Sequence, residues 1–158
     1  MTPSSAGGLG RGQRLKIIIA EKDRQTVKTI TTSLRRRWPE ATVTPSDNGE
    51  STLRLFRQQC PEVVLLGVNL PGKDGFQLLQ EIRRLSDATV VMLAEREDEA
   101  EQIQALDLGA DAYIAKPFRH TTIVSRINSM LRRRAWQRTT SSCGDTSFSN
   151  GRNDREDE

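Results

Sequence analysis

The stretch VVLLGVNLPGKDGFQLLQEIR, residues 63–83, decides the fold of this chain of 158 residues. It opens with an uninterrupted apolar run, residues 63–66, which is typical of a strand buried on both faces of a sheet. A loop rich in turn residues follows at positions 69–75. The apolar residues after that loop recur at helical spacing. The stretch therefore predicts a strand, a loop and a helix in that order, which is the repeating unit of an α/β sheet.

Four further apolar runs predict strands on either side of that unit, at residues 16–20, 41–44, 89–93 and 111–115. Amphipathic patterns of helical period separate the runs, and one more follows the last of them, so that five strands alternate with five helices. Connections between parallel strands are right-handed and place helices on both faces of the sheet. The alternation predicts a doubly wound, five-stranded parallel sheet of the flavodoxin type, (βα)5, with strand order 2-1-3-4-5.

Acidic residues mark the places where several of these helices begin. Asp23 has the position of an N-cap residue. Asp47 with Glu50, and Asp98 with Glu101, have the spacing of a capping box. Behind the second box, three apolar residues are expected to face the core: Ile103, Leu106 and Leu108.

Composition divides the chain into one domain and two extensions. Residues 1–14 are rich in Gly and Ser and predict a flexible arm. Residues 136–158 are polar and end in a dense run of charges, which predicts a disordered tail. The 121 residues between them, 15–135, suffice for one hydrophobic core.

The overall composition excludes several classes of protein. The two cysteines, Cys60 and Cys143, lie far apart and support neither a disulfide framework nor a thiolate metal site, which favours a reducing, cytoplasmic compartment. No apolar run approaches the roughly 18 residues that span a bilayer, so no membrane partner is expected. The net charge of +3 is too small to indicate nucleic-acid binding by itself. The arginine clusters lie near predicted helix ends, where the helix dipole favours cations, so we expect no direct nucleic-acid contact.

In an open α/β sheet, the working crevice lies beyond the carboxyl ends of the strands. The residues expected there follow the first, third, fourth and fifth strands: Glu21, Lys22, Asp23, Gly67, Ala94, Glu95 and Lys116.

Residues 16–134 resemble the receiver domain of response regulators, most specifically in residues 63–83 and in LGADAYIAKPF, residues 108–118. The run IVSRINSMLRRR, residues 123–134, is similar to the last receiver helix of winged-helix transcription regulators of the OmpR/PhoB type. The resemblance implies an aspartate nucleophile that ends the third strand and accepts a phosphoryl group. It also implies an acidic pair that holds Mg²⁺ after the first strand, a hydroxyl after the fourth and a lysine after the fifth.

This chain departs from that set at most positions. Gly67 stands where the nucleophile is implied, Lys22 where the second acid is implied, and Ala94 where the hydroxyl is implied. Lys116 matches the family lysine, and Tyr113 matches the aromatic residue that switches conformation in the family. We therefore expect an atypical, non-enzymatic receiver that is not phosphorylated on aspartate and binds no Mg²⁺ or other metal.

The charges that remain in the crevice suggest a permanent ionic network. We expect Lys116 and Lys22 to pair with Glu21, Asp23 or Glu95, where a metal and a phosphoryl group would sit in the family. The alternative is that these are simply solvated loop charges.

The resemblance also implies a homodimer through the fourth helix, the fifth strand and the fifth helix. The matching charged residues are Asp98, Glu101, Asp107 and Asp111 on one side, and Arg119, Arg126 and Arg132 on the other. A two-fold axis could pair each set with its opposite in a second copy. Ala112 and Thr122 replace acids that are usual in the family. The alternative is an ordinary charged surface.

The leading interpretation is thus a protein-interaction module in signal transduction and transcription regulation, acting through an output domain or a partner protein. Two alternatives remain open. A substitute carboxylate could accept the phosphoryl group, although Asp74 lies in a turn where aspartate commonly shapes the backbone. A cavity above Gly67 could admit a small molecule and make the chain a sensor.

Overall fold

The computed structural model describes residues 15–138, in which five strands and five helices alternate along the chain. The strands are β1 (Lys16–Ala20), β2 (Thr42–Ser46), β3 (Val63–Gly67), β4 (Thr89–Ala94) and β5 (Ala112–Ala115). The helices are α1 (Arg24–Arg37), α2 (Gly49–Gln59), α3 (Gly75–Leu85), α4 (Glu99–Asp107) and α5 (His120–Arg138).

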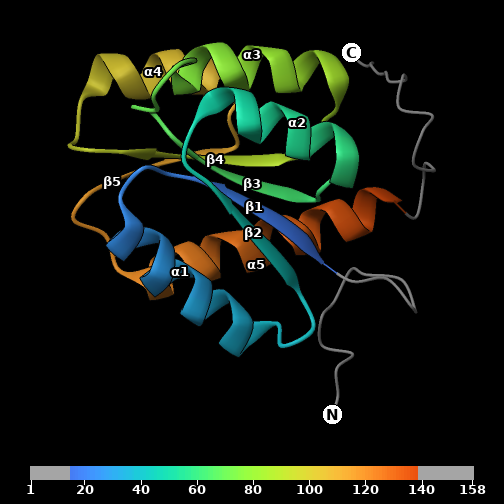
Figure 1. The fold of residues 1–158 in the computed structure, drawn as a ribbon. Coiled ribbons are helices and arrows are strands. Elements are labelled where there is room, and N and C mark those ends of the chain that lie inside the picture. The colour runs from blue at the N-terminus through green and yellow to red at the C-terminus, as the bar shows by residue number, and fades with distance from the viewer. Residues whose placement is uncertain (1–14, 139–158) are drawn as a thin grey trace, which may run out of the picture.

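The five strands form one parallel sheet in the order β2-β1-β3-β4-β5, which confirms the predicted topology. Helices α2, α3 and α4 cover one face of the sheet, and α1 and α5 cover the other (Figure 1). The central strand β3 is buried along its whole length, as the apolar run at residues 63–66 predicts. Each face of the sheet packs against its helices in a separate apolar core.

The last helix is longer than the sequence indicates. Helix α5 continues to Arg138, three residues beyond the end of the domain expected at residue 135. The arm expected at residues 1–14 and all but the first three residues of the tail expected at residues 136–158 lie outside the described residues. Among the residues described, no helix is both long and apolar enough to cross a membrane.

The second strand and the second helix both begin later than predicted. Strand β2 runs through Pro45 to Ser46, which is possible because β2 lies at the edge of the sheet, where proline is tolerated. Helix α2 is capped by Asn48, whose side-chain oxygen accepts a hydrogen bond from the amide of Ser51 at 2.8 Å. Asp47 is therefore not the N-cap, and the capping box expected there does not form.

Helix α4 differs most from its predicted packing. Asp98 caps the helix, but the side chain of Glu101 bonds elsewhere instead of completing a capping box. Only Ala105 of this helix is buried, whereas Ile103 and Leu106 are 53% and 44% exposed. The expectation that these two residues face the core is wrong, because α4 contacts the sheet mainly through its smallest apolar residue.

Arg83, at the end of α3, ties three segments together. Its guanidinium donates hydrogen bonds to the carbonyl of Gly109 at 2.9 Å, to the carbonyl of Ala88 at 2.7 Å and to the carboxylate of Asp111 at 2.9 Å. Burial lowers the pKa of Arg83, and the charge of Asp111 opposes that effect. The end of α3, the start of β4 and the segment before β5 are thereby held as one unit.

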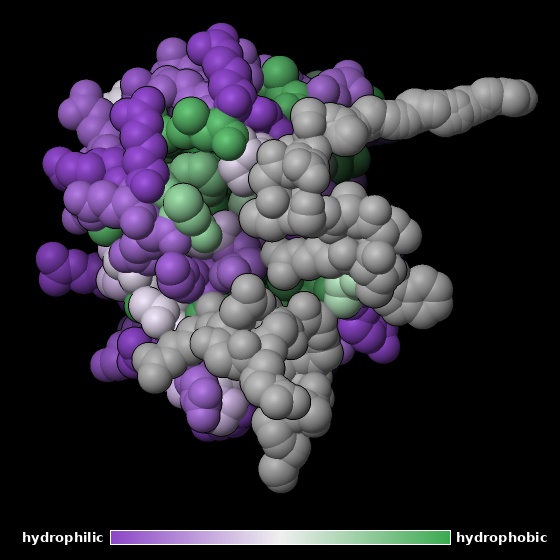
Figure 2. Space-filling view, turned by 90° about the vertical axis from the view of Figure 1, so that its right-hand side faces the viewer, coloured by the Kyte–Doolittle hydropathy of each residue, from purple (hydrophilic) through white to green (hydrophobic). Residues whose placement is uncertain are grey.

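All helices of a doubly wound sheet run opposite to the strands, so their carboxyl ends gather where the strands begin. Figure 2 shows this end of the domain, where β1 begins, and most of the coloured surface there is hydrophilic, around a smaller hydrophobic patch. The last turns of α1 and α3 place five arginines here: Arg35, Arg36, Arg37, Arg83 and Arg84. Cations at these positions are favoured by the helix dipole.

The position of the α2 cap can be tested by two neighbouring substitutions. Asn48→Ala removes the acceptor for the Ser51 amide and should lower the free energy of unfolding by about 1 kcal/mol. Asp47→Ala, the control, should change it by less than about 0.5 kcal/mol. Urea unfolding of both variants checks the assignment, and a larger loss for Asp47→Ala would contradict it.

Candidate functional site

The expected site residues lie together at the carboxyl-terminal ends of the strands. Glu21 follows β1, Gly67 ends β3, and Ala94 ends β4. Lys116 follows β5, and its amide donates a hydrogen bond to the carbonyl of Ala94 at 2.9 Å. Because parallel strands end at a common edge, residues nearly a hundred positions apart in the sequence share one site.

The ammonium group of Lys116 lies among three carboxylates. Its Nζ is 3.4 Å from Glu95 Oε2, 3.6 Å from Glu21 Oε2 and 3.8 Å from Asp23 Oδ2. The side chains of Glu95 and Asp23 are 46% and 48% exposed, whereas that of Glu21 is 3% exposed. Lys116 thus makes the ion pairs expected of it, and only the pair with Glu21 is shielded from water on the carboxylate side.

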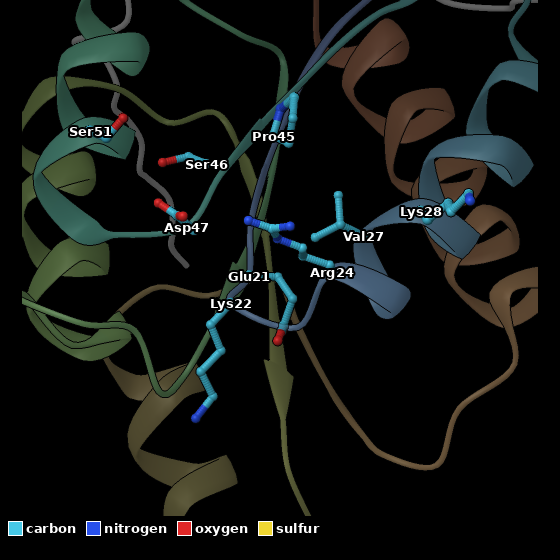
Figure 3. Close-up of a pocket in the computed structure, with 9 residues that line it drawn as sticks. All are labelled: Glu21, Lys22, Arg24, Val27, Lys28, Pro45, Ser46, Asp47 and Ser51. Atoms are coloured by element: carbon cyan, nitrogen blue, oxygen red, sulfur yellow. The ribbon is translucent and has the colours of Figure 1, made fainter.

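Lys22 does not join this network. It is exposed, and within residues 15–138 the structure records no ion pair for it. Figure 3 shows its side chain extending away from the loop after β2. The expectation that Lys22 pairs with the neighbouring carboxylates is therefore wrong. A lysine beside a buried carboxylate gains nothing from turning inward when Lys116 already occupies that position.

Glu21 is the least exposed charged residue of the site, and its carboxylate has two contacts that fix it. Oε2 accepts a hydrogen bond from the amide of Asp23 at 3.0 Å. Oε1 lies 3.0 Å from the point where a Cβ on Gly67 would be. The carboxylate thus takes up the space beside Gly67, where the sequence left open a cavity for a small molecule.

A hollow of about 390 Å³ does lie nearby, between the start of α1 and the loop that joins β2 to α2. Arg24 extends toward that loop, which carries Ser46 and Asp47 (Figure 3). Ser46 donates a hydrogen bond to the carbonyl of Asn48, so its hydroxyl is already engaged in the loop itself. The hollow is open to solvent and lies beside Glu21, not above Gly67.

Asp23 caps α1 at the mouth of the site. Its carboxylate accepts hydrogen bonds from the hydroxyl of Thr26 at 2.6 Å and from the amide of Gln25 at 3.2 Å. The bond from Thr26 contributes most to lowering the pKa of Asp23, and the charge of Lys116 adds a smaller part. Asp23 is thus held as an anion by its own helix as well as by Lys116.

Tyr113 is buried beneath α4, with 8% of its surface exposed. Its hydroxyl donates to Glu101 Oε1 at 2.7 Å and lies 3.3 Å from the carbonyl of Arg96. Burial, reinforced by Glu101, raises the pKa of Tyr113 far above its usual range, so the hydroxyl remains a donor. The bond between Tyr113 and Glu101 connects β5 to α4.

The charged residues expected on a dimer face fall into two groups: some have partners within the domain, and others are exposed without a recorded partner in residues 15–138. Asp98 caps α4, Glu101 bonds to Tyr113, and Asp111 pairs with Arg83 at 2.9 Å. Four others are exposed and have no recorded ion pair among the described residues: Asp107, Arg119, Arg126 and Arg132. Sequence reasoning missed Arg83 as the partner of Asp111, because the two lie on elements separated by a whole strand and helix.

Comparison with known proteins gives a consistent result. A family model described as the response regulator receiver domain matches residues 17–128. The probable transcriptional regulator ycf27 of Porphyra purpurea is 35% identical over 121 residues, which are 77% of this chain and 49% of that protein. The transcriptional regulatory protein BaeR of Escherichia coli is 41% identical over 86 residues, 54% of this chain and 36% of BaeR. The chain spans at most half the length of these curated relatives.

Solved structures share the fold. The BeF3-activated receiver domain of RstA from Klebsiella pneumoniae superposes with a TM-score of 0.69 at 27% identity, covering 74% of this chain and 98% of that one. DrrB of Thermotoga maritima, described as an OmpR/PhoB homologue, gives a TM-score of 0.70 at 24% identity over 77% of this chain and 54% of DrrB.

The causes of the low pKa of Asp23 can be separated by NMR. Thr26→Val removes the strongest contribution and should raise the pKa of Asp23 more than Lys116→Met does. Because the folded pKa lies below the unfolded one, Asp23 stabilises the fold at neutral pH, and this is lost as pH falls through the folded pKa. Titration of the side-chain carboxyl carbons measures both shifts. A larger shift for Lys116→Met would contradict this order.

Proposed function

Because this chain belongs to the response-regulator receiver family, we propose that it is a non-enzymatic signalling module that acts through protein contacts without phosphorylation on aspartate. The observation that carries the proposal is Gly67 at the end of β3, beside a Lys116 already paired with carboxylates of the chain itself. Its matched relatives are named as transcriptional regulators, which supports a role in transcription control.

Phosphoryl transfer to a carboxylate depends on a positioned nucleophile and on neutralised charge. Gly67 offers no oxygen, and the nearby carboxylate of Glu21 is bound by the Asp23 amide and faces Lys116. Asp74, the candidate substitute, caps α3 and accepts a hydrogen bond from the amide of Gln77 at 2.9 Å. Both of these carboxylates are thus already engaged in contacts within the chain.

The residues of the site do not suit Mg²⁺, which the family implies. Magnesium takes hard oxygen ligands in near-octahedral geometry. Here the ammonium of Lys116 lies between the oxygens of Glu21 and Asp23, and Lys22 replaces the second acid. Within residues 15–138, no three Asp, Glu, His or Cys side chains are grouped as a metal site would require. We therefore expect this site to bind no Mg²⁺.

The ionic network also favours a single conformation. The pair between Lys116 and Glu21 needs no signal to form, and Tyr113 is buried and bonded to Glu101. A receiver in this condition presents the same surface at all times. Its control would come from the amount of the protein or from its partners.

Intact-mass measurement tests the absence of phosphorylation. The full chain incubated with acetyl phosphate and Mg²⁺ should keep its mass, since no free carboxylate stands at the end of β3. A receiver that carries the family aspartate, treated in parallel, is the positive control. A gain of one phosphoryl group by this chain would overturn the proposal, and Asp74→Asn would then show whether Asp74 is the acceptor.

We further propose that the chain forms a homodimer through α4, β5 and α5. Ile103 and Leu106 expose large apolar side chains on α4 without a partner in the described part of the chain. Arg119 and Arg126 supply unpaired cations on the side of α5. Exposed ion pairs contribute well under about 1 kcal/mol each, so the apolar residues should carry most of the association.

Sedimentation velocity tests this interface. Ile103→Asp places a charge among the apolar residues and should raise the dimer dissociation constant at least about tenfold, which corresponds to 1.4 kcal/mol. Leu85→Asp is the matched control, because Leu85 is 50% exposed but lies on α3, outside the proposed interface. Equal effects of the two substitutions, or a wild-type chain that stays monomeric, would contradict the proposal.

A further inference from the structure

We infer that Glu21 is a permanent internal ligand of this site: its carboxylate occupies the space left by the missing side chain of Gly67 and holds Lys116 in place. The two positions are then one coupled unit, in which a glycine on β3 and an inward-turned glutamate after β1 require each other. The inference deepens the proposed function and rests on it, because it names what fills the receiver site in place of a phosphorylatable aspartate.

The environment of Glu21 is that of a bound anion. The side chain is 3% exposed, and an ionised carboxylate removed from water is unfavourable unless it is hydrogen-bonded and paired. The amide of Asp23 donates to Oε2 at 3.0 Å, and the ammonium of Lys116 lies 3.6 Å from the same oxygen. A backbone amide and a lysine thus form a cradle for one carboxylate, and the chain supplies that carboxylate itself.

The φ angle of Gly67 does not require glycine. The glycines with positive φ in residues 15–138 are Gly72 and Gly109, and Gly67 is the last residue of an ordinary strand. A Cβ on Gly67 would instead meet Glu21 Oε1 at 3.0 Å and the carbonyl oxygen of Ala20 at 3.2 Å. Both contacts are tighter than a Cβ normally makes, and the closer one is with the inward carboxylate, so Glu21 contributes to the crowding at this position.

The other two carboxylates near Lys116 do not share this role. Glu95 and Asp23 approach the ammonium from the solvent side, with 46% and 48% of their side chains exposed. Pairs of this kind are screened by water and salt. The three atoms nearest to the Cβ position of Gly67 belong to Glu21 and Ala20, and none belongs to Glu95 or Asp23. Glu95 is therefore a matched control for Glu21: it has the same charge and the same lysine partner, but it is not among the groups nearest to the Cβ position of Gly67.

A double-mutant cycle tests the coupling on the full chain. Gly67→Ala should lower the thermal midpoint by at least about 3 °C in the wild-type background, a shift easily measured for a domain of this size. In the Glu21→Ala background, Gly67→Ala should lower the thermal midpoint by less than half of that amount. The contact with the Ala20 carbonyl is common to both backgrounds and cancels in the cycle. In the Glu95→Ala background, Gly67→Ala should lower the thermal midpoint by as much as it does in the wild type.

Glu21→Gln separates shape from charge, and it covers the case in which Glu21→Ala does not fold. Glutamine keeps the size of glutamate, so Gly67→Ala should remain as costly in this background as in the wild type. Equal costs of Gly67→Ala in the wild-type and Glu21→Ala backgrounds would overturn the inference. If Glu21→Ala does not fold, the Glu21→Gln background decides. The inference would be overturned if Gly67→Ala no longer lowered the thermal midpoint in that background.

Sodium acetate tests the cradle directly. Shortening Glu21 to alanine removes a carboxymethyl group, the size of acetate, while the Asp23 amide and Lys116 remain. Acetate at about 100 mM should therefore raise the midpoint of Glu21→Ala more than chloride at equal ionic strength, since a ligand that binds only the folded state stabilises it. The wild type and the Glu21→Ala/Lys116→Met variant should not respond. No acetate effect on a folded Glu21→Ala variant would overturn the cradle.

These results and the phosphorylation test fail separately. A phosphoryl group found on the wild-type chain would contradict the proposed function. The double-mutant cycle at positions 21 and 67 would still decide whether Glu21 and Gly67 are coupled. Additive effects of the substitutions at positions 21 and 67 on the thermal midpoint would contradict the role of Glu21 as an internal ligand. They would not contradict the proposal that the receiver is unphosphorylated.

Discussion

A carboxylate that leaves water must find a cation and hydrogen-bond donors, and the site of this protein is organised by that requirement at Glu21. The glutamate follows β1, its cation follows β5, and the gap that admits it lies at the end of β3. One ion pair therefore connects strands from both halves of the sheet. It explains why Lys116 is held in a defined position although glycine ends β3.

Much of the fold could be predicted because the pattern of apolar residues is regular. Short buried runs alternate with helical patterns, and this alternation leaves few topologies. The errors are local and have local causes. Asp47 and Asn48 are both good N-cap residues, so only the backbone decides between them. Ile103 and Leu106 were expected in the core because a helix of nine residues offers too little periodicity to identify its buried face.

The candidate site was predicted as a set of residues but not as an arrangement. The ends of parallel strands meet at one edge, which is enough to bring Glu21, Gly67 and Lys116 together. The inward turn of Glu21 could not be predicted, because it depends on empty space that a residue more than forty positions away leaves. The sequence also does not distinguish Lys22 from Lys116, although only Lys116 approaches the carboxylates.

The guanidinium of Arg83 has a consequence for recognition. Through Gly109 it anchors the segment that follows α4, while the bond from Tyr113 to Glu101 holds the first turn of the same helix. A helix fastened near both ends has little freedom to tilt or slide. A binding partner would therefore meet a surface that is already in its final shape, and complex formation would lose little conformational entropy. Such a surface suits rapid, rigid docking and would favour a partner of matching shape.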